Sequence, residues 1–373
     1  MSALPRILVR VLTAGVVVTA FAAPSALAQV TPAAGGTPPV DIPSVRVGTT
    51  IYTDYTYIDE PTVKDADGNV IHSSSFNVTR AYINVTGNFS HWVSFRVTPD
   101  VARESGTGSS LSGSLTFRLK YAFGQVNFDD FLTHGSWARL GVQQTPYVDF
   151  MEGIYRYRFQ GTMFPEREGF ITSSDFGLTG HYNFPGNYGD IHAGVYNGDG
   201  YSRAEANDQK AFQVRASLRP LPLRGFWKGL RLHAFYDADK YVRRGPRDRF
   251  VATATFEHSR LNAGFDYLDV KDRTSISNPE VKGNGWAVWV VPRLLTVGES
   301  KPGLEGLFRY DSMRPNKSAD ARRHRLIVGL AYWFPFLRGP SAALLADMDR
   351  ATFDVALNRP TDKRYSLHAL FAF

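Results

Sequence analysis

The sequence predicts an all-β protein, a transmembrane antiparallel β-barrel of about 16 strands with short periplasmic turns and longer extracellular loops. Three observations predict it. Apolar and polar residues alternate along most of the chain, the last alternating segment ends on an aromatic residue, and the first residues have the pattern of an export signal. Successive strand side chains point to opposite faces, so this alternation indicates a wall between hydrocarbon and water.

The first 28 residues have the features of a cleaved signal peptide. Arg6 and Arg10 form a short basic region, an apolar run follows over 11–23, and the tripeptide at 26–28 fits a small-x-small cleavage site. A membrane anchor is the alternative interpretation, but the apolar run is too short to span a bilayer comfortably. We therefore expect residues 1–28 to be removed on export.

The overall composition agrees with an exported barrel. The chain has no cysteine, so no disulfide stabilises it in an oxidising compartment. Its mean hydropathy is −0.23 while aromatic residues make up 13%, as expected when only alternate residues face lipid. A pI near 9.4 is also typical of proteins that bind nucleic acid, but the predicted export and the lack of a basic cluster with stacking motifs argue against such a partner.

Three segments follow from these patterns. Residues 1–28 are the signal peptide, residues 29–44 are a flexible segment rich in Pro, Gly, Thr and Ala, and residues 45–373 form the barrel. At roughly 20 residues per strand with its share of loop, the last segment holds about 16 strands. Representative apolar faces are Val45, Val47, Thr49 and Ile51; Ala81, Ile83 and Val85; Leu115, Phe117, Leu119 and Tyr121; Leu326, Val328, Leu330 and Tyr332; and Tyr365, Leu367, Ala369, Phe371 and Phe373.

The polar faces of the same strands carry more cations than acids. A barrel this wide leaves an aqueous channel, so we expect these cations to line the lumen and attract anions. The alternative is that they hydrogen-bond across the wall and brace it. Strand parity alone places these cations on the polar faces: Arg46, Arg80, Arg96, Arg118, Lys120, Arg139 and Arg215.

Turns and loops alternate along the chain, as is typical of outer-membrane barrels. Tight turns are predicted near 89–90, 184–189 and 220–225. Longer polar connections are predicted at 58–75, 100–113, 146–174, 199–209, 239–249 and 270–284.

The loop over 146–174 follows about the fifth strand and carries the strongest functional pattern. Arg156 and Arg158 alternate with aromatic residues, and the pair Glu166-Arg167 follows. If this loop folds into the lumen and narrows it, its guanidinium groups would face permeating anions, as rings of Arg or Lys do in anion channels. The alternative is a surface loop whose arginines pair with acids in the same segment, such as Glu152.

Several loose motifs follow one another along the chain. They are Arg80-Ala81-Tyr82 with Gly87, Trp137-x-Arg139-Leu140-Gly141-x-Gln143-x-x-Pro146, Glu166-Arg167, Val195-Tyr196-Asn197-Gly198-x-Gly200 and Phe308-Arg309-Tyr310-Asp311. In this order they resemble the phosphate-selective porins of the O and P type. The resemblance covers most of residues 45–373 and implies a 16-stranded, trimeric, passive anion channel. The arginine ladders and lysine clusters of that family have no residue-by-residue match here, so the resemblance supports a porin better than phosphate selectivity.

This interpretation sets the expected location and partners. We expect the outer membrane of a Gram-negative-type bacterium, contact with membrane lipid and lipopolysaccharide, small anionic solutes, and a homotrimer. Phe373 would be the signal read by the barrel-assembly machinery. The run at 322–325 is either an outer loop that binds lipopolysaccharide phosphates or an ordinary solvated loop.

Catalytic and metal-binding patterns are weak. The sequence contains no HExxH, no phosphate-binding glycine loop and no Gly-x-Ser-x-Gly elbow. The segment 65–69 is faintly calcium-like, but a loop-tip turn is the better interpretation. We expect no enzyme, metal or cofactor. Two alternatives stay open: an outer-membrane barrel enzyme of the lipase or protease type, and a secreted β-sandwich adhesin.

Overall fold

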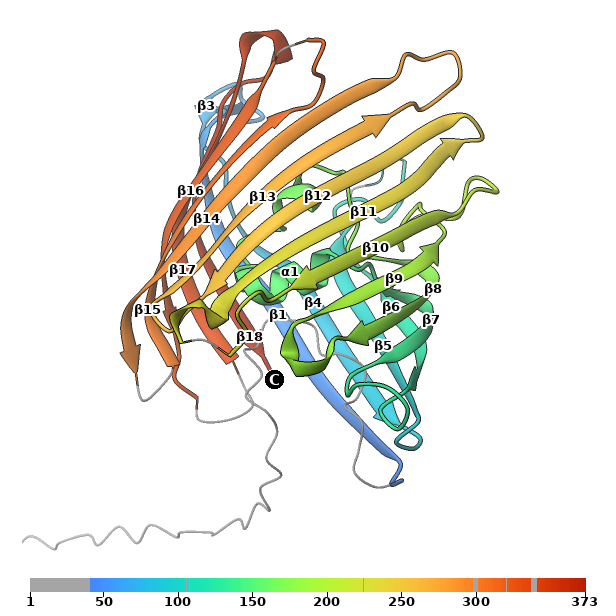
Figure 1. Ribbon diagram of the computed structural model, residues 1–373. Helices are drawn as coiled ribbons and strands as arrows, with labels where there is room; N and C mark the ends of the chain where they lie inside the picture. Colours follow the sequence, from blue (N-terminus) through green and yellow to red (C-terminus); the bar gives the residue numbers. More distant parts are fainter. Residues whose placement is uncertain are drawn as a thin grey trace, which may run out of the picture.

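The computed structural model describes residues 41–104, 106, 108–223, 225–297, 301–319, 321–336 and 341–373. Within them, sixteen strands form one closed antiparallel barrel, with both ends of the strand series at the same rim (Figure 1). The predicted signal peptide and nearly all of the predicted flexible segment lie outside the described residues. The barrel strands are β1 (Ser44–Glu60), β4 (Ser74–Asn88), β5 (Val93–Arg103), β6 (Leu115–Asn127), β7 (Trp137–Gln144), β8 (Ser174–Asn183), β9 (Gly189–Tyr196), β10 (Ala211–Leu218), β11 (Leu230–Val242), β12 (Gly245–Glu257), β13 (Leu261–Asp272), β14 (Val281–Val297), β15 (Lys301–Arg314), β16 (Arg323–Trp333), β17 (Ser341–Phe353) and β18 (Asp362–Ala372).

The barrel closes where its first strand meets its last. β1 pairs antiparallel with β18, and Thr49 and Phe373 exchange two backbone hydrogen bonds of 2.9 Å. Phe373 itself is 81% exposed at the rim. Closure leaves no strand edge, which is the condition for a sheet to lie in hydrocarbon, where no water can satisfy backbone groups. Among the described residues, no helix has the length and apolar content needed to cross a bilayer.

The predicted alternation is confirmed on most strands. On β10, Phe212 and Leu218 are exposed on the outer surface, whereas Arg215 between them is buried inside. On β16, Val328 and Leu330 are similarly exposed. Alternate residues of these strands therefore face outward, as the period of two predicts.

One predicted face is wrong near the middle of β6. The register between β5 and β6 shifts between Thr98 and Pro99, so that one extra residue, Lys120, interrupts the ladder. Such a bulge moves every following side chain to the other face. Tyr121, which the sequence assigns to the apolar face of Leu119, is therefore fully buried inside the barrel.

Two predicted connections are also wrong in extent. The segment 239–249 is a tight hairpin rather than a long loop, because β11 continues to Val242 and β12 begins at Gly245. Its charged side chains, such as Asp239 and Arg249, are buried on the inner side of the strands. Polar strand ends that face a polar interior have the composition of a loop. Conversely, the predicted short turn at 220–225 extends through a 3₁₀ turn at Phe226–Gly229.

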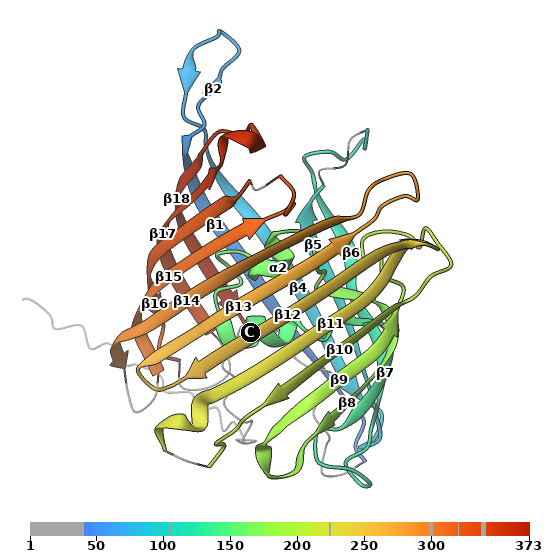
Figure 2. The ribbon, with the colours of Figure 1, turned by 45° about the horizontal axis from the view of Figure 1, so that its top comes forward.

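A small hairpin lies in the connection between β1 and β4. It is formed by β2 (Val63–Lys64) and β3 (Val70–Ile71), which pair only with each other and project beyond the barrel rim (Figure 2). At its tip, Asp65 Oδ1 accepts hydrogen bonds from the backbone N–H groups of Asp67 and Asn69. The faintly calcium-like segment is thus a turn closed by its own aspartate, as expected.

Candidate functional site: the loop inside the barrel

The connection between β7 and β8 lies inside the barrel, where two short helices are visible through the wall (Figures 1 and 2). The helices are α1 (Val148–Tyr155) and α2 (Phe164–Arg167). Arg156 caps the C-terminus of α1: its φ of 68° is in the left-handed region, and its backbone N–H donates to the carbonyl of Glu152. Pro165 occupies the first turn of α2, where a missing N–H costs nothing. We call residues 145–173 the inner loop.

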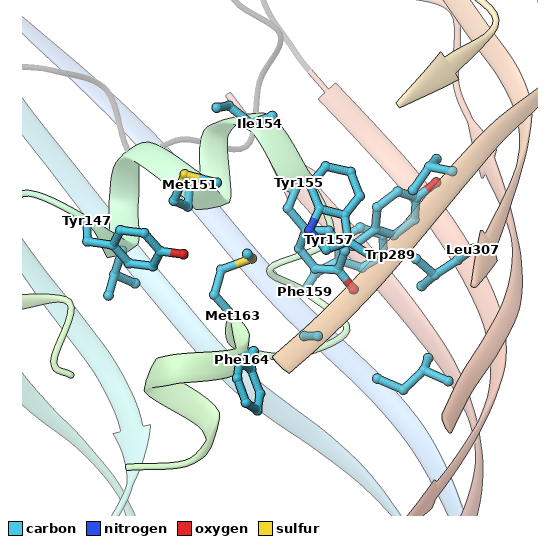
Figure 3. Close-up of a cluster of buried hydrophobic side chains, with 14 of the residues drawn as sticks. Tyr147, Met151, Ile154, Tyr155, Tyr157, Phe159, Met163, Phe164, Trp289 and Leu307 are labelled. Atoms are coloured by element: carbon cyan, nitrogen blue, oxygen red, sulfur yellow. The ribbon is translucent and has the colours of Figure 1, made fainter. Parts of the chain in front are cut away.

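The inner loop is attached to the wall by a hydrophobic core. Figure 3 shows aromatic and methionine side chains of the loop gathered with Trp289 of β14 and Leu307 of β15. Tyr155 packs edge-on against Trp289 with ring centroids 5.2 Å apart, and Tyr157 packs edge-on against Trp333 at 5.9 Å. All four rings are at most 8% exposed. Tyr52 of β1 and Tyr82 of β4 belong to the same core. Strands β11–β18 contribute these inward-facing apolar residues: Phe235, Val251, Leu268, Val270, Ala287, Trp289, Val291, Leu307, Met313, Ile327, Ala331, Trp333, Ala343, Leu345 and Leu370.

Buried polar contacts fasten the same loop. Glu305 of β15 is fully buried and accepts hydrogen bonds from Arg156 at 2.7 Å and from the hydroxyl of Tyr157 at 2.6 Å. The hydroxyl of Tyr147 donates to Asp266 at 2.8 Å. Because charges buried this deeply need partners, these contacts fix the position of the loop against β13–β16. We call the inner faces of β11–β18 the loop-bearing half.

The predicted loop arginines are held by acids rather than left facing water. Arg156 is 4% exposed and pairs with Glu305. Arg158 pairs with Glu152 inside the loop, with 2.8 Å between Nε and Oε1. Arg167 lies 3.8 Å from Asp311 and donates to Gln160, while its neighbour Glu166 is partly exposed. The pairing of Arg158 with Glu152 matches the alternative that the sequence left open, although the loop lies inside rather than on the surface.

The opposite wall, formed by the inner faces of β4–β10, has a different character. Arg80 and Arg118 share a single carboxylate, Asp100, which is fully buried. Lys120 is 3% exposed, and its ammonium has no hydrogen-bond or ion-pair partner among the described residues. It lies 5.0 Å from the ring centre of Tyr82 and 5.3 Å from that of Tyr121. We call this wall the cationic half.

The remaining predicted cations are arranged unevenly. Arg96 donates to Asn84 at 3.0 Å and lies over the Tyr121 ring at 4.4 Å. Arg139 donates to Gln125 and Gln144 and lies 3.6 Å from the ring centre of Trp137. These residues lie on neighbouring strands with Lys120.

Arg215 and Arg46 differ from this group. Arg215 pairs with Asp190 and donates to the carbonyl of Pro146. Arg46 is exposed near the beginning of β1. Five of the seven cations predicted from parity therefore lie together on β4–β7. Arg215 lies inside the barrel on β10, and Arg46 lies apart from the others.

The basic run at 322–325 is not a loop that presents its arginines outward. Arg323 and Arg325 belong to β16, where Arg323 pairs with Glu168 of the inner loop and Arg325 pairs with Asp349 of β17. These two arginines are thus engaged with acids of the barrel itself. Within the described residues, no group of three or more His, Asp or Glu side chains is arranged to hold a metal ion.

Sequence reasoning missed the residues that anchor the inner loop. Glu305, Asp266 and Trp289 are wall residues whose partners are more than 100 positions away in the chain. One signal was available: between 286 and 291 apolar residues fall on both faces of the strand. A strand that is apolar on both faces must cover its inner face with protein, because water would not solvate it.

Comparison with known proteins agrees with this architecture. No family model and no curated protein sequence matches the chain. Among solved structures, an anion-selective porin from Comamonas acidovorans aligns with a TM-score of 0.59 and 12% identity over 89% of this chain and 100% of that one. The trimer form of OmpT, an outer membrane protein of Vibrio cholerae, aligns with a TM-score of 0.56 and 12% identity over 89% of this chain and 100% of that one. The outer membrane channel DcaP of Acinetobacter baumannii aligns with a TM-score of 0.53 and 13% identity over 89% of this chain and 97% of that one. This chain therefore has the sixteen-stranded barrel fold of outer-membrane porins.

Proposed function

We propose that the protein is an outer-membrane porin, a water-filled channel for passive diffusion of small hydrophilic solutes that prefers anions. The inner loop narrows the lumen, and solutes pass the loop within reach of the field of the cationic half. The observation that carries the anion preference is the charge excess around Asp100. Arg80 and Arg118 share that one carboxylate, while the ammonium of Lys120 has no acidic partner among the described residues.

The position of these cations makes them effective. A charge on the wall of a narrow passage acts on a permeating ion more strongly than the same charge at an exposed surface, because the low-dielectric protein around the passage focuses its field. Tyrosine rings hold Lys120 in place without neutralising it, since a ring face attracts a cation and carries no net charge. Arg139 is likewise held by neutral amides and rings. An anion entering the passage therefore meets uncompensated positive charge.

The loop arginines have a different role in this proposal. Arg156 and Arg158 are satisfied by Glu305 and Glu152, so they position the constriction instead of selecting the ion. Phosphate is the first polyvalent anion to test, because the resemblance to phosphate-selective porins suggests it. The trimeric form among the similar structures supports a homotrimer. The predicted signal peptide at 1–28 and the terminal Phe373 support export and insertion by the barrel-assembly machinery.

The test is the reversal potential across a planar bilayer under a salt gradient. The native channel is expected to favour chloride over potassium, and phosphate is expected to reduce the chloride current. Lys120→Gln removes about 1 kcal/mol of attraction at water-like dielectric, so the permeability ratio should fall roughly fivefold. Lys64→Gln in the exposed β2–β3 hairpin is the matched control and should leave the ratio unchanged.

Two results would count against the proposal separately. A native permeability ratio at or below one contradicts the anion preference but not the channel. Absence of stepwise current from folded protein contradicts the channel itself.

A further inference from the structure

A cavity of about 200 Å³ lies between the beginning of the inner loop and the wall of β7–β10. Arg139, His181, His192 and Arg215 of the wall line it together with Asp149 and Phe150 of α1. Its volume is several times the roughly 30 Å³ that one water molecule occupies in the liquid. It is large enough for a small organic solute.

Two of the lining groups already have partners. Arg215 pairs with Asp190, and its guanidinium lies 3.6 Å from the ring centre of Phe150. His181 is within hydrogen-bonding distance of both Asp190 and the carbonyl of Gly135. These contacts make a rigid and electrically satisfied border, which leaves three other polar groups to be explained.

The three other groups are each more than nine-tenths buried and lack a complementary partner. Arg139 forms no ion pair among the described residues: its hydrogen bonds go to the neutral amides of Gln125 and Gln144, and its guanidinium lies over the rings of Trp137 and Phe123. Asp149 receives a hydrogen bond from the Tyr121 hydroxyl on Oδ2, and its Oδ1 has no partner.

The third group is His192, whose ring nitrogens have no hydrogen-bond partner in the described part of the chain. Buried groups of this kind are rarely left unsatisfied unless a ligand or water completes them.

Their charges select the ligand. Arg139 is a cation that lacks a carboxylate, and Asp149 offers one free carboxylate oxygen. A solute with both a carboxylate and an ammonium group complements the two at once, while a simple anion would be repelled by Asp149. His192 can add one hydrogen bond to either group, according to its tautomer. Trp137 also lines the cavity, and its indole, which is stacked on His181 at 5.1 Å and lies 3.6 Å from the Arg139 guanidinium, fixes the positions of both groups.

We propose that this cavity is a binding site for a small zwitterion, an α-amino acid, whose carboxylate binds Arg139 and whose ammonium binds Asp149. The proposal rests on the proposed channel function, because the cavity borders the route through the barrel. It gives the channel a site that retains amino acids as they pass the inner loop. The site lies beside the charge excess around Lys120 and differs from it in containing an acid with a free oxygen.

Calorimetric titration of the folded protein in detergent tests the site directly. The probes are L-alanine and propionate, which share a carbon skeleton and a carboxylate and differ by the ammonium group. We expect alanine to bind at least tenfold more tightly than propionate. In Asp149→Asn, which keeps the shape and an acceptor for Tyr121, that preference should fall below twofold. In His192→Phe, which keeps an aromatic ring, alanine should bind several-fold more weakly.

Asp54→Asn is the matched control, because Asp54 is a carboxylate on the inner face of β1 that does not line the cavity. It should retain the native preference for alanine. Equal binding of the two probes by the native protein, or no binding of either, overturns the site without any variant. A loss of preference in Asp54→Asn equal to that in Asp149→Asn also overturns it, because the effect would then not be local.

The two proposals can fail separately. If the protein conducts chloride but does not distinguish alanine from propionate, only the proposal of the amino-acid site is refuted. If it binds alanine preferentially but passes no current, the proposed channel function is refuted and the proposed site stands.

Discussion

The loop-bearing half and the cationic half of the inner wall belong to one sheet but face different environments. On β13–β16 the inward residues are largely apolar and meet the inner loop in a core that includes Trp289 and Leu307. On β4–β7 they are polar, and cations such as Arg96 and Lys120 are held by amides and aromatic rings. The same alternation therefore gives an apolar core on one side and a polar, cation-rich inner surface on the other. Strand periodicity determines which residues point inward but not what they meet.

This difference assigns separate tasks to the two halves. The loop-bearing half positions the inner loop through packing and through Glu305, and its arginines are largely neutralised by acids. The cationic half keeps positive charge that its acids do not balance. A fixed obstacle on one side and excess charge on the other is an arrangement that can select ions without a moving part.

The largest expected effect comes from breaking the core of the loop-bearing half. Trp289→Ala removes a ring that is 1% exposed and packs against Tyr155. A large-to-small substitution of this kind costs about 3–5 kcal/mol. We expect the inner loop to loosen, with a larger and noisier single-channel conductance and a lower unfolding midpoint in urea.

A control for that change lies on the same strand. Trp286 is on the outer face, where it packs against Tyr310 with ring centroids 5.4 Å apart. Trp286→Ala should leave the conductance unchanged. If Trp289→Ala conducts like the native channel, the core does not hold the loop in place.

A smaller effect tests whether the two halves share one outer environment. Val328 on β16 and Leu178 on β8 are both exposed on the outer surface, at 43% and 59%. Arginine at either position should destabilise the barrel by about 2–4 kcal/mol if the site is near the bilayer midplane. The measurement is urea-dependent folding into lipid vesicles. A penalty at one site alone would mean that the other is covered by protein, as at a subunit interface.

The smallest expected effect concerns the turn that ends β4, at the rim of the cationic half. The hydrogen bond from His91 to Asp41 raises the pKa of the imidazole above its usual value near 6.5. The hydrogen bonds from His91 likewise lower the pKa of Asp41. The stabilisation that His91 contributes to the folded protein is fully present below the pKa of His91 in the unfolded chain, and it is lost as the pH rises through the raised pKa of the folded state. The stabilisation that Asp41 contributes is lost as the pH falls through the lowered pKa of Asp41 in the folded state.

We therefore expect the segment 41–44 to become more accessible to protease as the pH is raised from 6 to 9. In His91→Gln, accessibility should be the same at both pH values. Equal accessibility in the native protein across that range would mean that the contact does not hold the segment.

The fold could be predicted from sequence to a large extent, because a barrel in lipid is constrained strand by strand. Every outward residue must suit hydrocarbon, so the pattern around Val328 or Phe371 is visible locally. The errors have local causes. The bulge at Lys120 reverses the faces of β6, and polar strand ends such as Asp239 have the composition of a loop. Neither is visible in alternation alone.

The candidate site was predicted less completely. The cations on β4–β7 follow from parity, and the inner loop was located by its position after the fifth strand. The partners of its arginines were not found. Glu305 lies 149 positions from Arg156, and nothing in the local pattern connects them. Likewise, Arg139, Asp149 and His192 come from three separate segments that meet only at the cavity.

The sequence by itself determined which side chains face outward on most strands, that the last strand ends on an aromatic residue, and that cations predominate on the inner faces of the first strands. These properties follow from the alternation of residues that contact lipid or water, so they can be recognised in short segments of the sequence. Only the tertiary structure decided which inner face is covered by the loop, which arginines are neutralised and which polar groups remain without partners. Those outcomes depend on distances between residues far apart in the chain, which are set when the barrel closes around the loop.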